Sequence, residues 1–234
     1  MPLSEKITRS EAVQILLEER VFTYDLLRRI FVEEPSRELI KALHNEDFLH
    51  NLPLNEESEE LRRGVEDVSN YLKSFDVLSN AEFEKLHWDY TRMFIGPYEL
   101  PAPPWESAYL DEDRMLFQET TLQVRRTYLK YRFLPRYYMQ EADDHLGLEL
   151  DFMYRLSHMA ADSALSRDIN TCKQILVDQK NFLEQHLLNW VPLFADNVNE
   201  SANTAFYIGF AKILKHYLQL DYDVISEILE ELDV

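Results

Sequence analysis

The chain has 234 residues, 46% of them hydrophobic, which is enough to fold around a core of its own. Its 24 basic and 43 acidic side chains give a net charge of −19, which repels nucleic acids and anionic membrane surfaces and favours a cationic partner. The single cysteine, Cys172, excludes an internal disulfide and a metal site built from several thiolates.

The first part of the chain is predicted to be mainly helical. Helical spacing of apolar residues, proline positions and capping residues predict helices at residues 8–31, 36–45, 56–75 and 79–96. The first and the last of these begin with capping boxes, Thr8-x-x-Glu11 and Ser79-x-x-Glu82. The last helix is expected to end where Pro97 follows a glycine.

A rigid loop interrupts the helices between Tyr90 and Leu110. This stretch reads Y-T-R-M-F-I-G-P-Y-E-L-P-A-P-P-W-E-S-A-Y-L and holds four of the nine prolines, which exclude a helix or a central strand. A disordered linker is typically poor in aromatic residues, whereas this stretch is rich in them. Its prolines are Pro97, Pro101, Pro103 and Pro104, and its aromatic residues include Phe94, Tyr98, Trp105 and Tyr109. We therefore expect an ordered loop with a function.

The rest of the chain is again predicted to be helical. The expected helices cover residues 119–133, 143–160, 164–187, 190–198, 203–219 and 222–232. The polar segment 197–204 is expected to be a mobile connection. No alternation of apolar and polar residues is long enough for a strand. The sequence thus predicts an all-α fold, in which residues 1–234 form a single-domain helical bundle of about ten helices with the proline-rich loop in its middle.

No segment of the sequence predicts export or membrane insertion. The N-terminal segment carries acids among its bases and lacks the apolar run of a signal peptide. No window approaches the roughly eighteen apolar residues that a membrane span needs. We therefore expect the protein to stay in the cytoplasm, where an acidic surface is also ordinary.

The segment Glu141–Glu149 reads E-A-D-D-H-L-G-L-E and places four carboxylates and one imidazole at a predicted helix N-terminus. On a structural interpretation, Asp143 caps the helix and Asp144 lies in its first turn, where the helix dipole favours negative charge. On a functional interpretation, His145 and a carboxylate are exposed beside the proline loop and engage a cation or a guanidinium. The sequence alone leaves both interpretations open.

The same segment offers only a weak basis for enzymatic chemistry. His145 and Glu149 lie at i and i+4, a spacing found in helical metal sites, but the other histidines form no matching set. The sequence also lacks the motifs of nucleophilic catalysis and a Gly-rich phosphate loop. We therefore expect a non-enzymatic protein without a cofactor or metal. The alternative is a metal-dependent or nucleotide hydrolase that uses Asp144, His145 and Glu149.

The aromatic residues of the proline loop favour a binding function when they are taken together. Any one of them could simply cover the core. As a group, amphipathic aromatic side chains on a rigid proline frame form a suitable surface for a peptide, because they lose little conformational entropy on binding.

The loop and the acidic segment, in this order and about forty residues apart, resemble the TorD/DmsD/NarJ-like family of redox-enzyme maturation chaperones. The portion F-I-G-P-Y-E-L-P-A-P-P-W-E-S-A-Y-L is closest to the TorD and DmsD branch. The portion E-A-D-D-H-L-G-L-E-L-D-F-M is similar to its E-P-x-D-H signature, with Ala142 in place of the proline. A third segment, from His186 to Phe194, resembles H-L-x-x-W-x-P-x-F.

This resemblance implies a cytoplasmic, all-helical chaperone. Such a protein binds the twin-arginine leader of a molybdoenzyme precursor and holds it until cofactor insertion and folding are complete. The implied peptide-binding residues are Tyr90, Met93, Phe94, Pro104, Trp105, Asp144 and His145. We expect the leader's arginines to meet Asp144 and Glu141, and its apolar run to lie against Phe94 and Trp105.

Other properties stay open at this point. The protein is expected to be a monomer or a domain-swapped dimer, with a candidate hinge near residues 134–142. The sequence does not identify the client enzyme, nor whether the client is exported, nor whether a guanine nucleotide or the molybdenum cofactor binds. A helical adaptor for some other basic peptide is a further alternative.

Overall fold

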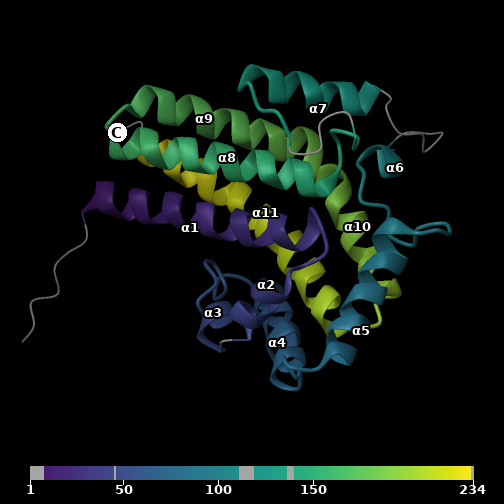
Figure 1. The fold of residues 1–234 in the computed structure, drawn as a ribbon. Helices are drawn as coiled ribbons and strands as arrows, with labels where there is room; N and C mark the ends of the chain where they lie inside the picture. Colours follow the sequence, from purple (N-terminus) through teal and green to yellow (C-terminus); the bar gives the residue numbers. More distant parts are fainter. Residues whose placement is uncertain (1–7, 45, 111–118, 136–139, 233–234) are drawn as a thin grey trace, which may run out of the picture.

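The computed structural model describes residues 8–44, 46–110, 119–135 and 140–232, which form helices and no strand (Figure 1). The helices are α1 (Arg9–Phe31), α2 (Arg37–Leu43), α3 (Glu46–His50), α4 (Glu59–Lys73), α5 (Asn80–Tyr90), α6 (Ser107–Leu110), α7 (Glu119–Lys130), α8 (Leu146–Leu165), α9 (Ile169–Phe182), α10 (Leu188–Ser201) and α11 (Ala205–Leu232). Two π-helical segments, Thr91–Ile95 and Leu183–Leu187, continue α5 and α9. The predicted all-α fold class is confirmed.

The helices pack around a long central element, α11. Helices α1, α8, α9 and α11 form the long part of the molecule, and α2, α3 and α4 lie below one end of it (Figure 1). The most extensive contacts join α1 to α8 and α4 to α11. None of the described helices is both long and apolar enough to cross a membrane. The single-domain organisation stays a prediction, and the candidate hinge includes residues 136–139, which lie outside the described residues.

Of the four helices predicted in the first part of the chain, two begin with the expected capping hydrogen bonds. Thr8 and Glu11 form the full capping box of α1, and the Ser36 side chain accepts the Leu39 N–H at the start of α2. The prediction of a second capping box is wrong, because the Ser79 side chain makes no capping hydrogen bond to α5. Helices α3 and α6 were not predicted, since each spans only about one turn and carries no periodic pattern.

Helix α11 is continuous, although the sequence predicts two helices with a break near residue 220. The break is wrong because the polar residue there faces the core. Asp221 is fully buried, and its carboxylate accepts bonds from Arg20 Nε at 2.5 Å and from the Tyr24 hydroxyl at 2.7 Å. Arg20 also donates to the Gln179 amide oxygen, so this buried pair connects α1, α9 and α11. Such a pair is costly to break, because the remaining charge would stay buried.

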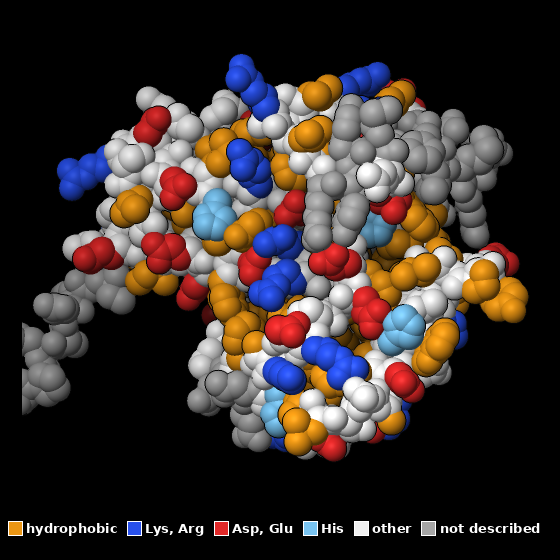
Figure 2. Space-filling model, viewed as in Figure 1, with side chains coloured by type: hydrophobic (Ala, Val, Ile, Leu, Met, Phe, Trp, Pro, Cys, Tyr) orange, Lys and Arg blue, Asp and Glu red, His pale blue; other side chains and the backbone are white. Residues whose placement is uncertain are grey.

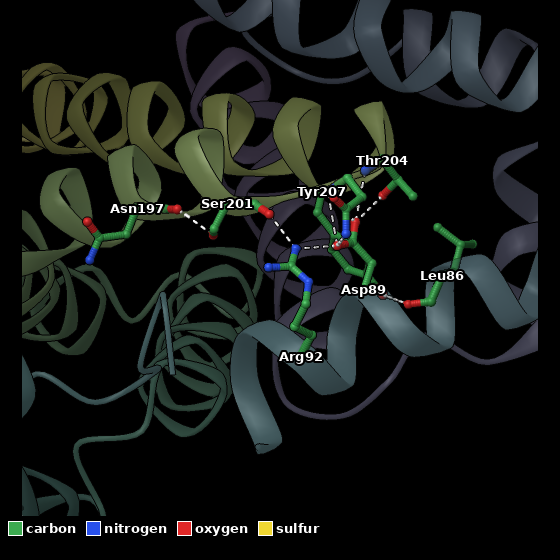
Figure 3. Close-up of polar contacts among 8 residues, drawn as sticks. Leu86, Asp89, Arg92, Asn197, Ser201, Thr204 and Tyr207 are labelled. Atoms are coloured by element: carbon green, nitrogen blue, oxygen red, sulfur yellow. Dashed lines mark hydrogen bonds and ion pairs between the residues drawn. The ribbon is translucent and has the colours of Figure 1, made fainter. Parts of the chain in front are cut away.

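The polar segment 197–204 is not a free connection. Helix α10 continues to Ser201, and the Asp89 carboxylate of α5 accepts the backbone N–H groups of Asn203 and Thr204 at 3.0 and 2.9 Å (Figure 3). Arg92 donates both to Asp89 and to the Ser201 carbonyl (Figure 3). Asp89 therefore satisfies donors at the start of α11, and the expected mobile connection is replaced by a hydrogen-bonded turn.

Candidate functional site

The proline loop and the acidic segment meet directly. Trp105 and His145 form an isolated antiparallel β-bridge. The Leu146 N–H donates to the Pro104 carbonyl at 2.8 Å, and the Glu106 N–H donates to the Asp144 carbonyl at 3.0 Å. These two bonds bring together the segments that carry the sequence resemblance and fix the loop at the N-terminus of α8.

A pocket of about 440 Å³ opens beside this bridge. It lies between the end of α1, the π-helical segment after α5, the proline loop and the start of α8. Its lining residues are Val32, Glu33, Glu34, Tyr90, Phe94, Ile95, Trp105, Gln140, Glu141, His145 and Leu148. Hydrophobic side chains gather in this hollow between the upper helices and α5, with acidic side chains next to them (Figure 2). We call it the bridge pocket.

Five of the eight residues singled out in the sequence line the bridge pocket: Tyr90, Phe94, Trp105, Glu141 and His145. Phe94 also packs against Phe194 of α10, with ring centroids 5.7 Å apart, so one aromatic wall of the pocket is continuous with the core. The core therefore holds this aromatic wall in place, which lowers the ordering cost of binding against it.

The other three residues do not line the pocket. Met93 is fully buried, and Pro104 is buried with its carbonyl bonded to Leu146. Asp144 is fully buried, and its carboxylate accepts the Ser107 N–H and the Thr121 hydroxyl, each at 2.9 Å. The expectation of an exposed Asp144 is therefore wrong, since both of its oxygens already bind groups of this chain.

Glu141 is the half-buried carboxylate of the acidic segment that reaches the pocket. Its Oε1 accepts the Trp105 indole N–H at 2.8 Å and the Ala142 backbone N–H at 3.0 Å. The indole is an obligate donor that needs a partner when it is partly buried. Glu141 thus sets the orientation of the Trp105 ring and keeps negative charge beside it.

His145, and not Asp143, is the N-cap of α8. Its Nδ1 accepts the Gly147 N–H at 3.0 Å, while Asp143 forms an ion pair with Arg125. The His145 ring stands edge-on to Trp105 with centroids 5.7 Å apart. Burial lowers the pKa of His145 to about 4, although the Asp144 charge acts in the opposite direction. The capping assignment of Asp143 is therefore wrong.

Sequence reasoning missed two acidic residues at the pocket. Glu33 and Glu34 follow the end of α1 and lie in the exposed turn before Pro35. Glu34 pairs with His87 of α5, with 2.8 Å between Glu34 Oε2 and His87 Nδ1. The sequence shows only an acidic pair at a helix end, which carries no indication that the turn would face residues more than fifty positions away.

On the interior side of the bridge lies a buried polar cluster. The Glu106 carboxylate is 2.9 Å from His186 Nδ1, and the Trp190 indole donates to Glu149 at 3.3 Å. Burial, followed by the negative charges of Glu106 and Asp144, raises the pKa of Glu149 well above its usual range.

The residues of the alternative hydrolase site do not come together in one place. Glu149 bonds Trp190 in the interior, whereas His145 uses Nδ1 for the helix cap and lines the pocket. Within the described ranges, no group of three or more His, Cys, Asp or Glu side chains is placed to hold a metal ion. The arrangement suits binding of a basic and apolar segment in the bridge pocket.

Comparison with known proteins identifies the family. Residues 54–196 match the family model described as nitrate reductase delta subunit. The chaperone protein TorD of Aliivibrio salmonicida is 27% identical over 207 residues, which cover 87% of this chain and 93% of that protein. The Tat proofreading chaperone DmsD of Salmonella typhi is 29% identical over 177 residues, which cover 76% of this chain and 74% of that protein.

A solved structure from Archaeoglobus fulgidus, described as a proposed redox enzyme maturation protein, is 20% identical and covers 93% of this chain and 98% of its own, with a TM-score of 0.46. That score is too low to add weight to the sequence matches. The relatives named here are chaperones and not enzymes, in agreement with the non-enzymatic function expected from the sequence. The family match covers more than half of this chain, which therefore belongs to the nitrate reductase delta subunit family of TorD- and DmsD-like redox-enzyme maturation chaperones.

Proposed function

We propose that this protein is a cytoplasmic chaperone that binds the twin-arginine leader of a molybdoenzyme precursor in the bridge pocket. It holds the leader until cofactor insertion and folding are complete. The observation that carries this proposal is the composition of the pocket, in which an aromatic wall adjoins carboxylates from two different segments. The named relatives, a TorD chaperone and a Tat proofreading chaperone, support the same class of ligand.

Both halves of a leader find complementary groups in the pocket. A guanidinium group bonds carboxylates through two parallel N–H groups and stacks on aromatic faces, so the arginine pair suits Glu34, Glu141 and Trp105. The apolar run that follows the arginines suits Tyr90 and Phe94. The net charge of −19 adds a long-range attraction for such a cationic segment.

The expected affinity is moderate. Burial of roughly 500 Å² of apolar surface would contribute about 12 kcal/mol at about 25 cal/mol per Å². Ordering a flexible peptide and losing rigid-body freedom offset much of this, which leaves a dissociation constant around micromolar, or about −8 kcal/mol. An affinity of this size allows the leader to be released after maturation.

The proposal is tested by calorimetry with leader peptides from the molybdoenzymes of the same genome, each compared with its Lys-Lys variant. Lysine keeps the charge but loses the bidentate geometry, so we expect one leader to bind at micromolar concentration and its Lys-Lys variant to bind at least tenfold more weakly. Absence of binding to every leader would contradict the proposal.

A matched pair of protein variants locates the site. Trp105→Ala removes a pocket residue, whereas Tyr98→Ala removes an aromatic residue of the same loop that is 87% exposed and does not line the pocket. We expect only the first to weaken leader binding. Equal leader binding by both variants and the wild type would exclude the bridge pocket and place the leader on a different surface of the protein.

A further inference from the structure

One carboxylate of the bridge pocket is held by a histidine of another helix. Glu34, in the turn after α1, lines the pocket, and its Oε2 lies 2.8 Å from Nδ1 of His87 on α5. His87 itself does not line the pocket. The pair joins segments that are 53 positions apart, and His87 therefore reaches Glu34 from outside the site.

This pair is easier to exchange than the other carboxylate contacts around the pocket. Glu141 binds the Trp105 indole and a backbone N–H through one oxygen, and Asp144 uses both of its oxygens in the interior. By contrast, the side chains of His87 and Glu34 are 44% and 41% exposed. Water competes with an ion pair at such an exposure, so the pair contributes little to stability. Glu34 can therefore exchange His87 for a guanidinium at low cost.

Helix α5 does not depend on this pair for its position. Arg37 of α2 donates to the Asn80 side-chain oxygen at the start of α5 at 2.9 Å. The same guanidinium lies over the Phe83 ring, 4.3 Å from its centroid, and Phe83 is buried. A substitution of His87 should thus change the surroundings of Glu34 without detaching the helix.

We propose that His87 is a positioning residue that sets how available Glu34 is to the arginines of the leader. Protonated His87 holds the Glu34 carboxylate by a charge-assisted hydrogen bond and so competes with a guanidinium, whereas neutral His87 forms a weaker bond. The leader therefore binds the form with neutral His87 more tightly, and its binding favours release of the His87 proton. This inference rests on the proposed leader-binding function and adds the dependence of that function on pH.

Histidine is the side chain that changes its charge between about pH 5 and pH 8. The histidine that lines the pocket, His145, stays neutral in this range because burial lowers its pKa to about 4. Other titratable or charged groups lie on the elements that meet at the pair or face it across the pocket. They are Arg28, Arg29 and Glu33 from α1 and its turn, Arg37 from α2, Glu84, Lys85 and Tyr90 from α5, and Glu141 and Asp151 from the acidic segment and α8. Their titration is common to the wild type and a His87 variant, so it cancels when the two are compared.

Two substitutions fix the charge of residue 87. His87→Gln removes the charge at every pH, and His87→Lys keeps it. At pH 6, His87→Gln should bind the leader about fivefold more tightly than wild type, which is the size of an exposed ion pair. At pH 8, His87→Gln should match the wild type, and His87→Lys should bind about fivefold more weakly. The control is His158→Gln, which changes an exposed histidine that is bonded to Tyr154 of its own helix and should follow the wild type at both pH values.

Calorimetry in two buffers of different ionisation enthalpy measures the released proton. Near pH 6.5, leader binding to the wild type should release up to about one proton more than binding to His87→Gln. The Glu34→Gln background shows whether the effect passes through Glu34, because His87→Gln should change the affinity there by less than about twofold. His87→Gln should unfold at nearly the same urea concentration as the wild type, since the pair is half-exposed.

The outcomes are distinct. Equal leader affinity of wild type and His87→Gln at pH 6, or equal proton release, would overturn the role of His87 and leave the leader-binding function standing. An effect of His87→Gln that persists in the Glu34→Gln background would also overturn it, because His87 would then not act through Glu34. A wild-type protein that binds no leader would overturn both.

Discussion

The two sides of the Trp105–His145 bridge place the side chains of neighbouring residues in different environments. Trp105 and His145 are the bridged pair and lie on the pocket side, whereas Glu106 and Asp144, each one residue away, point to the interior. Extended backbone sends successive side chains to opposite faces, so one short bridge sorts four chemically active residues into two environments.

The difference shows why proximity in the sequence does not reveal a residue's role. Asp144 and His145 are adjacent, yet the first has both oxygens bonded within the protein and the second lines the pocket. Substitutions on the interior side should therefore change stability, and substitutions on the pocket side should change affinity.

The largest effect is expected for Asp144→Ala on the interior side. The substitution leaves the buried Ser107 N–H and Thr121 hydroxyl without their acceptor, which costs about 3 kcal/mol of unfolding free energy. Urea denaturation followed by circular dichroism measures this, with Asp144→Asn as the control that keeps one acceptor oxygen and should lose less. Wild-type stability in the alanine variant would remove the distinction between the two sides.

Trp105→Ala on the pocket side should have the opposite signature. It removes a large half-buried aromatic contact, so leader affinity should fall about thirtyfold, or about 2 kcal/mol. Unfolding free energy should change by about 1 kcal/mol or less, because Glu141 is still partly solvated and loses only its indole donor. A loss of stability equal to that of Asp144→Ala would show that Trp105 is a structural residue.

Glu141→Gln sharpens the comparison within the pocket itself. The amide keeps an oxygen that can accept the indole and Ala142 N–H groups, but it removes the charge that would pair with a guanidinium. Affinity for the twin-arginine leader should fall about tenfold while stability stays within about 0.5 kcal/mol of wild type. Calorimetry should also show a smaller difference between the leader and its Lys-Lys variant, and an unchanged difference would assign arginine recognition to Glu33 and Glu34.

The helices could be predicted from the sequence because the residues that begin and end them lie close together in the chain. The capping box at Thr8 and the cap at Ser36 are each formed by side chains within three residues of each other. The meeting of loop and acidic segment was accessible only through the family resemblance. Features that depend on long-range contacts could not be predicted from the sequence. Asp221 indicates a break between two helices, because its partner Arg20 lies 201 residues away and the pairing is not visible in the sequence. Likewise, Glu33 and Glu34 join the pocket only through tertiary packing.

Glu149→Gln in the interior cluster should change the unfolding free energy least near pH 5. The change should grow as the pH rises. The pKa of Glu149 is raised by burial and by the charges of Glu106 and Asp144. The folded state therefore holds the proton more tightly than the unfolded state. This contribution to stability is full below the unfolded pKa of about 4.5 and is lost as the pH rises toward the folded pKa, by at most about 1.4 kcal/mol per pH unit.

Glutamine resembles the protonated carboxyl and does not titrate, so the stability of Glu149→Gln relative to wild type should rise between pH 5 and pH 7. Urea denaturation at several pH values measures this difference. His186→Gln serves as the control for the neighbouring pair with Glu106. A pH-independent difference between Glu149→Gln and wild type would mean that Glu149 is ionised in the folded protein. Its buried negative charge would then be stabilised by neighbouring groups and not removed by protonation.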